Sequence, residues 1–406
     1  MQWFHYIILL TIIIQAAIPL LVYRNYRFNL QKYKKKRTAF RPFAALCIPC
    51  KGLEPAFEKN IASFFKQDYE KYILRFVVEE KSDPAYKILC RLKENLSPVS
   101  KALDIKILVA GVGKSGACSQ KNHNLLYCIK QIPDDVQVLA FADSDICVSK
   151  DWLSHLVYPL RQPRNGVASG YRWFIPKNNK LTELVLSALN AKVAQLLGNS
   201  RFNQVWGGSM AIRAKNFKKL NIAELWAKSI SDDLSLSRAV KKNKMKVAFV
   251  PACLAASYEN TNWEKLFEFA RRQFIITRVN AFKTWLTALL ASLFSITAPI
   301  AAAGFAYLSL KNKDQYAQLL IIVPLILLAA QLTQAILREA MIAKILKEDR
   351  KDIKAARIFD IIFFWPLSFL FFFLVISSAF GKTITWRGIE YKLAGLANVT
   401  VIKNKP

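Results

Sequence analysis

Histidine is scarce in this chain, with three among 406 residues: His5, His123 and His155. His5 falls in an apolar N-terminal block and His155 in a predicted helix, so we do not expect a histidine-based metal site or catalytic triad. His123 stands near the start of another predicted helix, where phosphates can bind, but we interpret it as a core or capping residue. The sequence thus argues against histidine-centred chemistry.

Paired cysteines are also lacking. The seven cysteines are scattered without paired spacing, which predicts free thiols. Cys47-Ile48-Pro49-Cys50 has the spacing of a redox motif. It ends an apolar strand, however, and lacks the helix start that such a motif uses. We therefore exclude thiol redox chemistry.

Acidic residues are few, at 28 against 59 basic ones, so the formal net charge is +31, while 53% of the residues are hydrophobic. A soluble nucleic-acid binder would explain the charge but not the apolar blocks. The chain also lacks the basic, aromatic-interleaved motif of an RNA-binding module, so nucleic acid is not an expected partner. Attraction to anionic lipid headgroups and nucleotide phosphates explains the charge better.

Long apolar runs predict helices in a membrane. They cover residues 3–23, 285–308, 318–337 and 358–380, each close to the ~20 residues that a spanning helix needs. The first run is followed, not preceded, by basic residues between Arg24 and Arg41. This is the reverse of a cleaved signal peptide, and it predicts an anchor with its N-terminus outside and the next domain in the cytosol.

We accordingly predict an anchor at 1–23, a cytosolic domain at 24–280, and C-terminal transmembrane and interfacial helices at 281–406. The loop at 309–316 would face outward, and the basic segment at 338–357 would be cytosolic. Four crossings leave the tail after Gly381 outside. The tail carries Lys382, Arg387 and Lys392, which conflicts with the positive-inside rule. An interfacial rather than spanning segment would remove the conflict.

The predicted cytosolic domain alternates strands and helices. Strands are expected at 44–49, 73–78, 105–110 and 136–142, and helices at 55–67, from Asp83-Pro84 onward, and at 120–132. Such alternation predicts an α/β, Rossmann-like fold with a mostly parallel sheet covered on both faces. Ligands of such sheets bind beyond the carboxyl ends of the strands.

Two carboxylates stand at such an end. The apolar run that closes at Ala142 leads directly into Asp143-Ser144-Asp145. Carboxylate oxygens at this spacing suit Mg²⁺ or Mn²⁺, which leave room for substrate phosphates. A bare Asp-x-Asp is common by chance, and the buried strand before it is what favours a site for a nucleotide diphosphate.

Three other stretches hold candidate groups whose roles stay open on local grounds. Glu79-Glu80 ends the second strand and is either a ligand for a base or ribose, or a solvated strand end. In Asp232-Asp233, one aspartate would cap a helix that starts near Leu234, and the other would be free to accept a proton from a hydroxyl. Gly207-Gly208-Ser209 lies between helical segments, as a turn or a close approach of backbone to ligand.

Taken together, these stretches resemble a known family. The motifs are, in order, Lys51-Gly52-Leu53-Glu54-Pro55, Ser82-Asp83-Pro84-Ala85, Lys121-Asn122-His123-Asn124, Asp143-Ser144-Asp145, Gly207-Gly208-Ser209, Asp232-Asp233 and Trp386-Arg387-Gly388. Their order and spacing, over nearly the whole chain, resemble the ceramide glucosyltransferase family of inverting GT-A glycosyltransferases, which includes bacterial hopanoid relatives. The resemblance implies a GT-A fold.

The resemblance also implies roles for individual residues. Glu80, or its neighbour Glu79, would bind the nucleotide, with Lys51 and Lys121 also on the donor. Asp143 and Asp145 would hold Mg²⁺ or Mn²⁺, and Asp233 would be the catalytic base. Gly208 and Ser209 would contact the acceptor.

One family element is degenerate. Relatives carry Arg-x-x-Arg-Trp or Gln-x-x-Arg-Trp before the first C-terminal membrane helix, whereas this chain reads Ala270-Arg271-Arg272-Gln273-Phe274. The tryptophan is missing and Phe274 is the nearest aromatic residue, which we assign to the acceptor. Arg271 and Arg272 are displaced but can still supply positive charge to a leaving diphosphate.

The implied reaction moves a sugar, expected to be glucose, from a UDP-sugar to the hydroxyl of a membrane lipid such as ceramide, in sphingolipid metabolism, with inversion. Residues 181–198 form either a helix on the lipid headgroups or a buried core helix. Short loops and a compact chain favour a bacterial cell membrane over the Golgi. The alternatives are a processive polysaccharide synthase and a non-catalytic lipid- or nucleotide-binding relative.

Overall fold

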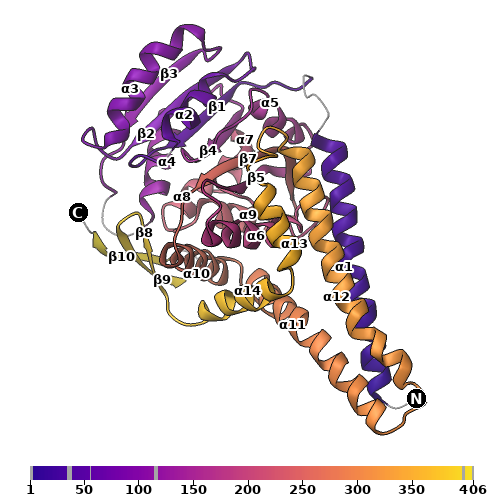
Figure 1. The fold of residues 1–406 in the computed structure, drawn as a ribbon. Helices are drawn as coiled ribbons and strands as arrows, with labels where there is room; N and C mark the ends of the chain where they lie inside the picture. Colours follow the sequence, from indigo (N-terminus) through magenta and orange to yellow (C-terminus); the bar gives the residue numbers. More distant parts are fainter. Residues whose placement is uncertain (1–2, 34–38, 55, 114–117, 396–397, 405–406) are drawn as a thin grey trace.

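The computed structural model describes all residues except 1–2, 34–38, 55, 114–117, 396–397 and 405–406. The chain has three parts: an α/β domain, a stalk of long helices, and a small C-terminal sheet against the domain (Figure 1). The basic residues at 34–37, which follow the predicted anchor, lie outside the described residues.

A seven-stranded sheet forms the centre of the α/β domain. Its strands are β1 (Ala44–Pro49), β2 (Tyr72–Val78), β3 (Asp104–Val109), β4 (Val138–Ala142), β5 (Asn165–Pro176), β6 (Ser209–Arg213) and β7 (Lys246–Glu259). The order is β3-β2-β1-β4-β6-β5-β7. All neighbours are parallel except those of β6, which runs antiparallel to β4 and β5. The predicted mostly parallel sheet is confirmed, and the four predicted strands are β1 to β4.

Helices cover both faces of this sheet. They are α2 (Phe57–Phe65), α3 (Pro84–Leu96), α4 (Gln120–Lys130), α5 (Trp152–Val157), α6 (Leu181–Ala194), α7 (Ala214–Lys219), α8 (Ile222–Trp226) and α9 (Asp232–Lys242), with 3₁₀ turns η1 (Ser97–Val99) and η2 (Tyr158–Arg161). As predicted, Asp83 caps α3 by accepting a hydrogen bond from the Ala85 amide at 2.8 Å.

Two cores, one on each face, explain why the strands read as continuous apolar runs. In β1, Leu46 faces the core that contains Phe64 and Trp152, whereas Cys47 faces the core that contains Trp226. All seven cysteines are free. Burial also raises the pKa of the Cys50 thiol well above its usual range, consistent with the exclusion of redox chemistry.

Helix α6 belongs to the core. Most of its residues are buried, and Leu186 and Leu189 pack with Phe174 of β5 and with Leu266 of α10 (Trp263–Asn280). Of the two interpretations of residues 181–198, the buried core helix is therefore correct for the helical part.

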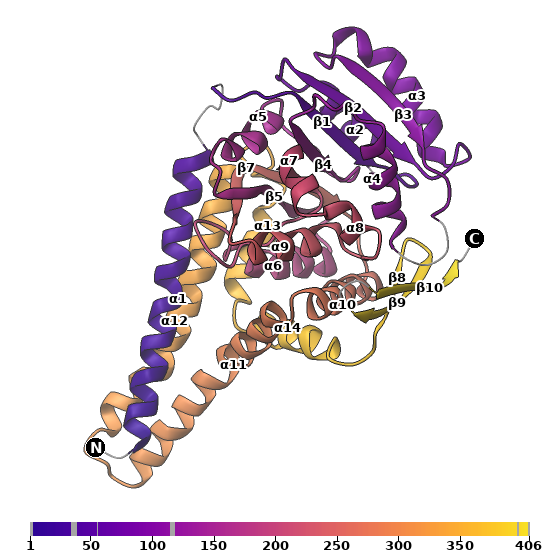
Figure 2. The same cartoon turned by 180° about the vertical axis from the view of Figure 1, so that it is seen from behind.

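The stalk contains three helices that are long and apolar enough to cross a membrane: α1 (Trp3–Tyr33), α11 (Phe282–Lys311) and α12 (Ala317–Ile345). They project away from the sheet, with the N-terminus and the α11–α12 connection at the far end (Figures 1 and 2). Exposed apolar side chains such as Leu20 and Leu319 line them. At the base, Asn25 and Asn29 of α1 donate hydrogen bonds to carbonyls of residues Gln195 and Leu197 at 3.1 Å.

Residues 358–380 do not form the straight spanning helix that their hydropathy predicts. They belong to α13 (Lys354–Ile362) and α14 (Pro366–Ser377), which meet at an angle of 91°. The predicted loop at 338–357 is also partly helix, because α12 continues to Ile345. Buried Arg338 of α12 pairs with buried Asp360 of α13 through two contacts of 2.5 and 2.6 Å. This ion pair holds α13 against the base of α12.

The C-terminal tail is a sheet, where helices are predicted. Strands β8 (Thr383–Trp386), β9 (Ile389–Gly395) and β10 (Asn398–Asn404) form an antiparallel three-stranded sheet. It contacts the α/β domain: Arg387 pairs with Glu54 at 2.6 Å, and the Gln120 amide donates to the Tyr391 hydroxyl at 3.4 Å. The tail therefore lies on the same side as the domain. This contact fits three crossings with an interfacial or re-entrant α13–α14 pair better than four crossings, and in that arrangement the tail does not conflict with the charge rule.

Candidate active site

The carboxyl ends of β1, β2 and β4 meet at one edge of the sheet, because β1 pairs in parallel with both neighbours. Lys51 follows β1, and its ammonium group lies 2.8 Å from the carboxylate of Glu79, which ends β2. Glu79 is buried, whereas Glu80 is exposed and accepts a hydrogen bond from Ser82 at 2.9 Å. Of the two glutamates, the fold thus turns Glu79 into the site.

A cluster of alternating charges, which we call the ion cluster, surrounds the end of β4. Lys121, in the first turn of α4, lies 2.7 Å from Asp143 and 2.9 Å from Asp232. Arg172 of β5 lies 3.5 Å from both Asp143 and Asp145. Two cations and three carboxylates from α4, α9, β5 and the β4 end therefore meet within ion-pairing distance.

Burial and pairing act against each other on these groups. Burial alone would lower the pKa of Lys121, but Asp143 and Asp232 hold that pKa well above its usual range. Burial would raise the pKa of Asp143, but Lys121 and Arg172 keep it below its usual value. For Asp145, burial prevails and raises the pKa. Burial likewise raises the pKa of Asp232 to about 6, despite its contact with Lys121.

The pKa of Asp232 predicts a stability effect. Because that pKa lies near 6 in the folded protein and 3.8 is its ordinary value, the folded state binds more protons than the unfolded state between these pH values. Stability therefore falls as pH rises through this window. In Asp232→Asn this loss is absent. The free energy of unfolding of the variant, relative to that of wild type, should therefore rise by about 2–3 kcal/mol from pH 4 to pH 7.

Chemical denaturation at pH 4 and at pH 7 measures this difference in the free energy of unfolding. The exposed Asp134, changed to asparagine, is the control that should show no such gain. Parallel pH profiles for wild type and Asp232→Asn would contradict a raised pKa at Asp232.

Asp233 lies beside the ion cluster in the first turn of α9. The helix begins at Asp232, and its cap is Ser231, whose hydroxyl accepts a hydrogen bond from the Leu234 amide at 3.0 Å. Neither aspartate therefore occupies the cap position, and both lie in the first turn of the helix. Asp233 accepts hydrogen bonds from the Ser231 hydroxyl at 2.5 Å, the Leu234 amide at 2.7 Å and the Gly207 amide at 3.0 Å. It remains partly exposed, whereas Asp232 is buried.

The glycine pair serves close packing. A Cβ on Gly207 would lie 2.5 Å from Asp232 Oδ2 and 2.8 Å from the Lys121 ammonium nitrogen, and one on Gly208 would lie 2.1 Å from the Trp206 indole. Ser209 begins strand β6, whereas the sequence predicts that it lies between helical segments. It is fully buried, and its hydroxyl accepts a hydrogen bond from the Trp152 indole at 3.0 Å. Ser209 therefore faces the core, which does not fit the predicted acceptor contact.

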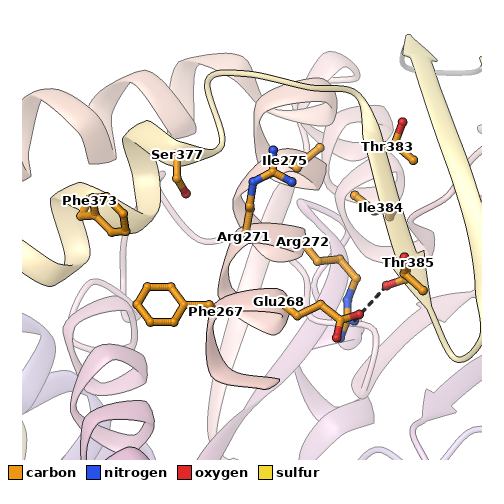
Figure 3. A pocket seen from close by; sticks show the side chains of 10 residues that line it. All are labelled: Phe267, Glu268, Arg271, Arg272, Ile275, Phe373, Ser377, Thr383, Ile384 and Thr385. Atoms are coloured by element: carbon orange, nitrogen blue, oxygen red, sulfur yellow. Dashed lines mark hydrogen bonds and ion pairs between the residues drawn. The ribbon is translucent and has the colours of Figure 1, made fainter. Parts of the chain in front are cut away.

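Arg271, Arg272 and Phe274 lie on α10 and contact the C-terminal region. Arg271 donates to the Phe380 carbonyl at 3.0 Å, and Arg272 to the Thr385 carbonyl at 3.1 Å. The Phe274 ring packs on Phe371 of α14 at 5.4 Å. The two arginines line a cavity of about 410 Å³ between α10, α14 and β8 (Figure 3). Their observed contacts thus anchor the tail.

Sequence reasoning missed Arg172, and it named the Trp386-Arg387-Gly388 motif without giving it a role in the site. Arg172 is a lone cation in a buried strand, and its guanidinium lies 5.0 Å from the Trp206 ring. That signal is ambiguous, because Arg75 is an even more deeply buried cation in β2 that pairs with Asp104 at 2.6 Å, away from the site. The link from Lys121 to Asp232 joins residues more than a hundred positions apart, and no local pattern reports it.

The residues at the end of β4 fit a divalent cation. Asp145 Oδ1 is buried and has no hydrogen-bond partner, which leaves one carboxylate oxygen available beside Asp143. The described part of the chain contains no group of three or more His, Cys, Asp or Glu side chains arranged for a metal. Two carboxylates suffice for Mg²⁺ when substrate phosphates and water supply the remaining ligands.

Several known proteins are similar to this chain. A ceramide glucosyltransferase of Gibberella zeae is 27% identical over 139 residues, which are 32% of this chain and 26% of that protein, so the match spans about a quarter of its length. A mannosyltransferase from Pyrobaculum calidifontis, solved with GDP-Man and Mn²⁺, is 15% identical, with 81% of this chain and 98% of that chain covered and a TM-score of 0.46. Glucosyl-3-phosphoglycerate synthase of Mycobacterium tuberculosis, solved with Mn²⁺ and UDP-glucose, is 13% identical, with 58% and 78% covered and a TM-score of 0.36.

The family is decided by sequence over nearly the full length. The model of glycosyl transferase family 21 matches residues 6–397, from the first stalk helix to the C-terminal sheet. This range contains the ion cluster, Asp233 and the Trp386-Arg387-Gly388 turn. The resemblance drawn from the short motifs is confirmed, and the chain belongs to glycosyl transferase family 21.

Proposed function

We propose that this protein transfers a sugar, with glucose the first candidate, from a UDP-sugar to the hydroxyl of a membrane lipid such as ceramide. The observation that carries the proposal is the cluster of Asp143, Asp145 and Asp232 at the carboxyl edge of the sheet. Asp233 lies beside this cluster on the Gly207 amide, and the domain is attached to apolar stalk helices. A water-soluble donor and a bilayer-dissolved acceptor can meet at such a junction. We further propose that the domain faces the cytosol of a bacterial cell membrane.

Donor binding is assigned to the edge residues. Glu79 and Lys51 are held together at 2.8 Å and are suited to orient the nucleoside and its phosphates. Asp143 and Asp145 would hold Mg²⁺ or Mn²⁺, which supplies positive charge to the departing diphosphate. Lys121 and Arg172, now paired with these carboxylates, add positive charge on the protein side of the same space.

Asp233 is assigned as the base. It is partly exposed, and two amides and one hydroxyl orient its carboxylate. It accepts the proton of the lipid hydroxyl while the hydroxyl oxygen attacks the anomeric carbon. The bond from that carbon to the diphosphate breaks on the opposite face, so the product is β-linked.

The cavity beside α10 is suited to an amphipathic acceptor. Phe267 and Phe373 line its apolar part, and Glu268 and Thr385 line its polar part. We assign Arg271 and Arg272 to the wall of this acceptor route, because they line the cavity and hold backbone carbonyls of the tail. Phe274 would act on the acceptor only indirectly, by packing α10 against Phe371 of α14. Of the two arginines, we assign to Arg272 the contact with a leaving diphosphate, which requires the diphosphate to extend toward α10.

The test is release of UDP by the full-length protein in detergent with Mn²⁺, offered UDP-glucose, UDP-galactose and UDP-N-acetylglucosamine with a total lipid extract. We expect lipid-dependent release that Asp143→Ala abolishes and that Asp134→Ala, at an exposed site, leaves intact. One sugar per lipid in the product separates this activity from a processive synthase. A folded protein that binds UDP but releases none from any donor would establish the non-catalytic alternative.

A further inference from the structure

The tip of the C-terminal hairpin lies over the donor edge of the sheet. Trp386 of β8 pairs with Ile389 of β9, so Arg387 and Gly388 form a two-residue turn. Both have positive φ, 49° and 79°, as in the type I′ turns that suit hairpins. Glycine adopts this conformation easily, whereas an arginine rarely does. An arginine in this position calls for an explanation from its side chain.

The Arg387 side chain reaches the loop that follows β1. It donates to the Lys51 carbonyl and pairs with the Glu54 carboxylate at 2.6 Å. The same loop is tied on its other side, where the Gly52 amide donates to Asp83 at 3.0 and 3.1 Å. Arg387 thus contacts a residue 336 positions away in the chain, in the loop after β1, the strand that pairs with β4.

Contacts with two helices of the domain hold the hairpin in this position. Tyr391 of β9 is buried, and its hydroxyl accepts a hydrogen bond from the Gln120 amide at the start of α4. On the other side, Arg271 and Arg272 of α10 hold the carbonyls of Phe380 and Thr385. The tip is therefore positioned by two elements of the domain before any ligand binds.

The contacts of the hairpin place Arg387 beside the proposed donor site. Lys51, whose carbonyl Arg387 binds, also pairs with Glu79 at the end of β2 at 2.8 Å. Gln120, whose amide holds Tyr391, is followed by Lys121, which pairs with Asp143 at 2.7 Å. The guanidinium therefore lies at the edge where a diphosphate would be held.

We propose that Arg387 is a donor-binding residue that contacts the diphosphate of the nucleotide, with Glu54 as its partner when the site is free. This inference rests on the proposed function. A planar guanidinium matches phosphate oxygens with two parallel hydrogen bonds. Arg271 and Arg272 bind backbone carbonyls of the tail. They position the tail, and Arg387 at its tip would contact the phosphates.

Calorimetric titration of the full-length protein in detergent with UDP, UMP and uridine tests this proposal. In Arg387→Gln, affinity for UDP should fall about ten- to hundred-fold, because a charge-assisted bidentate contact is lost, while affinity for uridine should not change. Arg387→Lys should recover only part of the affinity, since a lysine keeps the charge but not the fork. Lys392→Gln, exposed on the same sheet, is the control for general charge and should bind UDP as wild type.

Glu54→Gln separates a ligand from a structural tie. If Arg387 binds diphosphate, removal of the Glu54 charge leaves UDP affinity equal or higher. If Arg387 only fixes the loop, Glu54→Gln and Arg387→Gln weaken UDP and uridine alike, and the proposal is wrong. Unchanged UDP affinity in Arg387→Gln, at wild-type melting temperature, also overturns it. A wild-type protein that binds neither UDP nor GDP refutes the proposed function itself, whereas a preference for GDP moves the same test to GDP, GMP and guanosine.

Discussion

Asp233→Asn should lower the rate of sugar transfer by about 10²–10⁴-fold, the contribution expected of a general base. Asparagine has nearly the same shape and keeps one oxygen that can accept the hydrogen bonds of Ser231 and Leu234. It cannot accept the proton of an attacking hydroxyl. The loss should therefore appear in kcat, measured as lipid-dependent UDP release.

Two measurements make this result specific. UDP affinity by calorimetry should stay close to wild type, because Asp233 is not assigned to the donor. Asp232→Asn is the matched neighbour: Asp232 is buried and ion-paired with Lys121 at 2.9 Å, so it should affect donor binding more than proton transfer. If Asp233→Asn keeps its full rate, the base is another residue, and the mechanism proposed above is wrong.

Gly207→Ala should reduce transfer by about 10²-fold, the cost of roughly 1 Å of misplacement in an active site. The added methyl group would stand 2.5 Å from Asp232 and 2.8 Å from Lys121, closer than van der Waals contact permits. Either the Lys121–Asp232 ion pair opens or the Gly207 backbone retreats, and the Gly207 amide then loses Asp233. The first route disturbs the donor site and the second disturbs the base, so kcat or donor affinity, or both, should fall.

Gly304 provides the control for a glycine-to-alanine change. It lies in α11, and a Cβ there meets nothing within 4 Å. Gly304→Ala should leave transfer unchanged and be neutral or slightly stabilising, since alanine favours helix over glycine by about 1 kcal/mol. Equal activity in Gly207→Ala and wild type would show that the ion cluster tolerates displacement.

The local elements of the α/β domain could be predicted because their signals are local. Strands such as β1 and β4 are buried on both faces and therefore appear as continuous apolar runs. Helix α3 was predictable from its Asp83-Pro84 start, which the structure uses as cap and first turn. The start of α9 was displaced by two residues, because the cap is Ser231 and both aspartates lie in the first turn of the helix.

The candidate site also contains residues that the sequence predicts and residues that it does not predict. Asp143 and Asp145 could be named from sequence, since a strand end determines where they point. Arg172 and the Lys121–Asp232 pair could not, because the contacts join α4, β5 and α9 across the sheet. Ser209 was assigned to the acceptor from the family resemblance, yet strand alternation turns its hydroxyl to the Trp152 indole in the core.

The sequence by itself determined the family, the alternating α/β domain, three long apolar helices and the carboxylates at the end of β4. Hydropathy and spacing record composition along the chain, and each of these features depends on neighbouring residues. Only the tertiary structure decided that residues 358–380 bend by 91° and that the tail returns to the domain as a sheet. Those outcomes depend on the Arg338–Asp360 and Arg387–Glu54 pairs. The second pair connects residues far apart in the chain, and no hydropathy window contains both partners of such a contact.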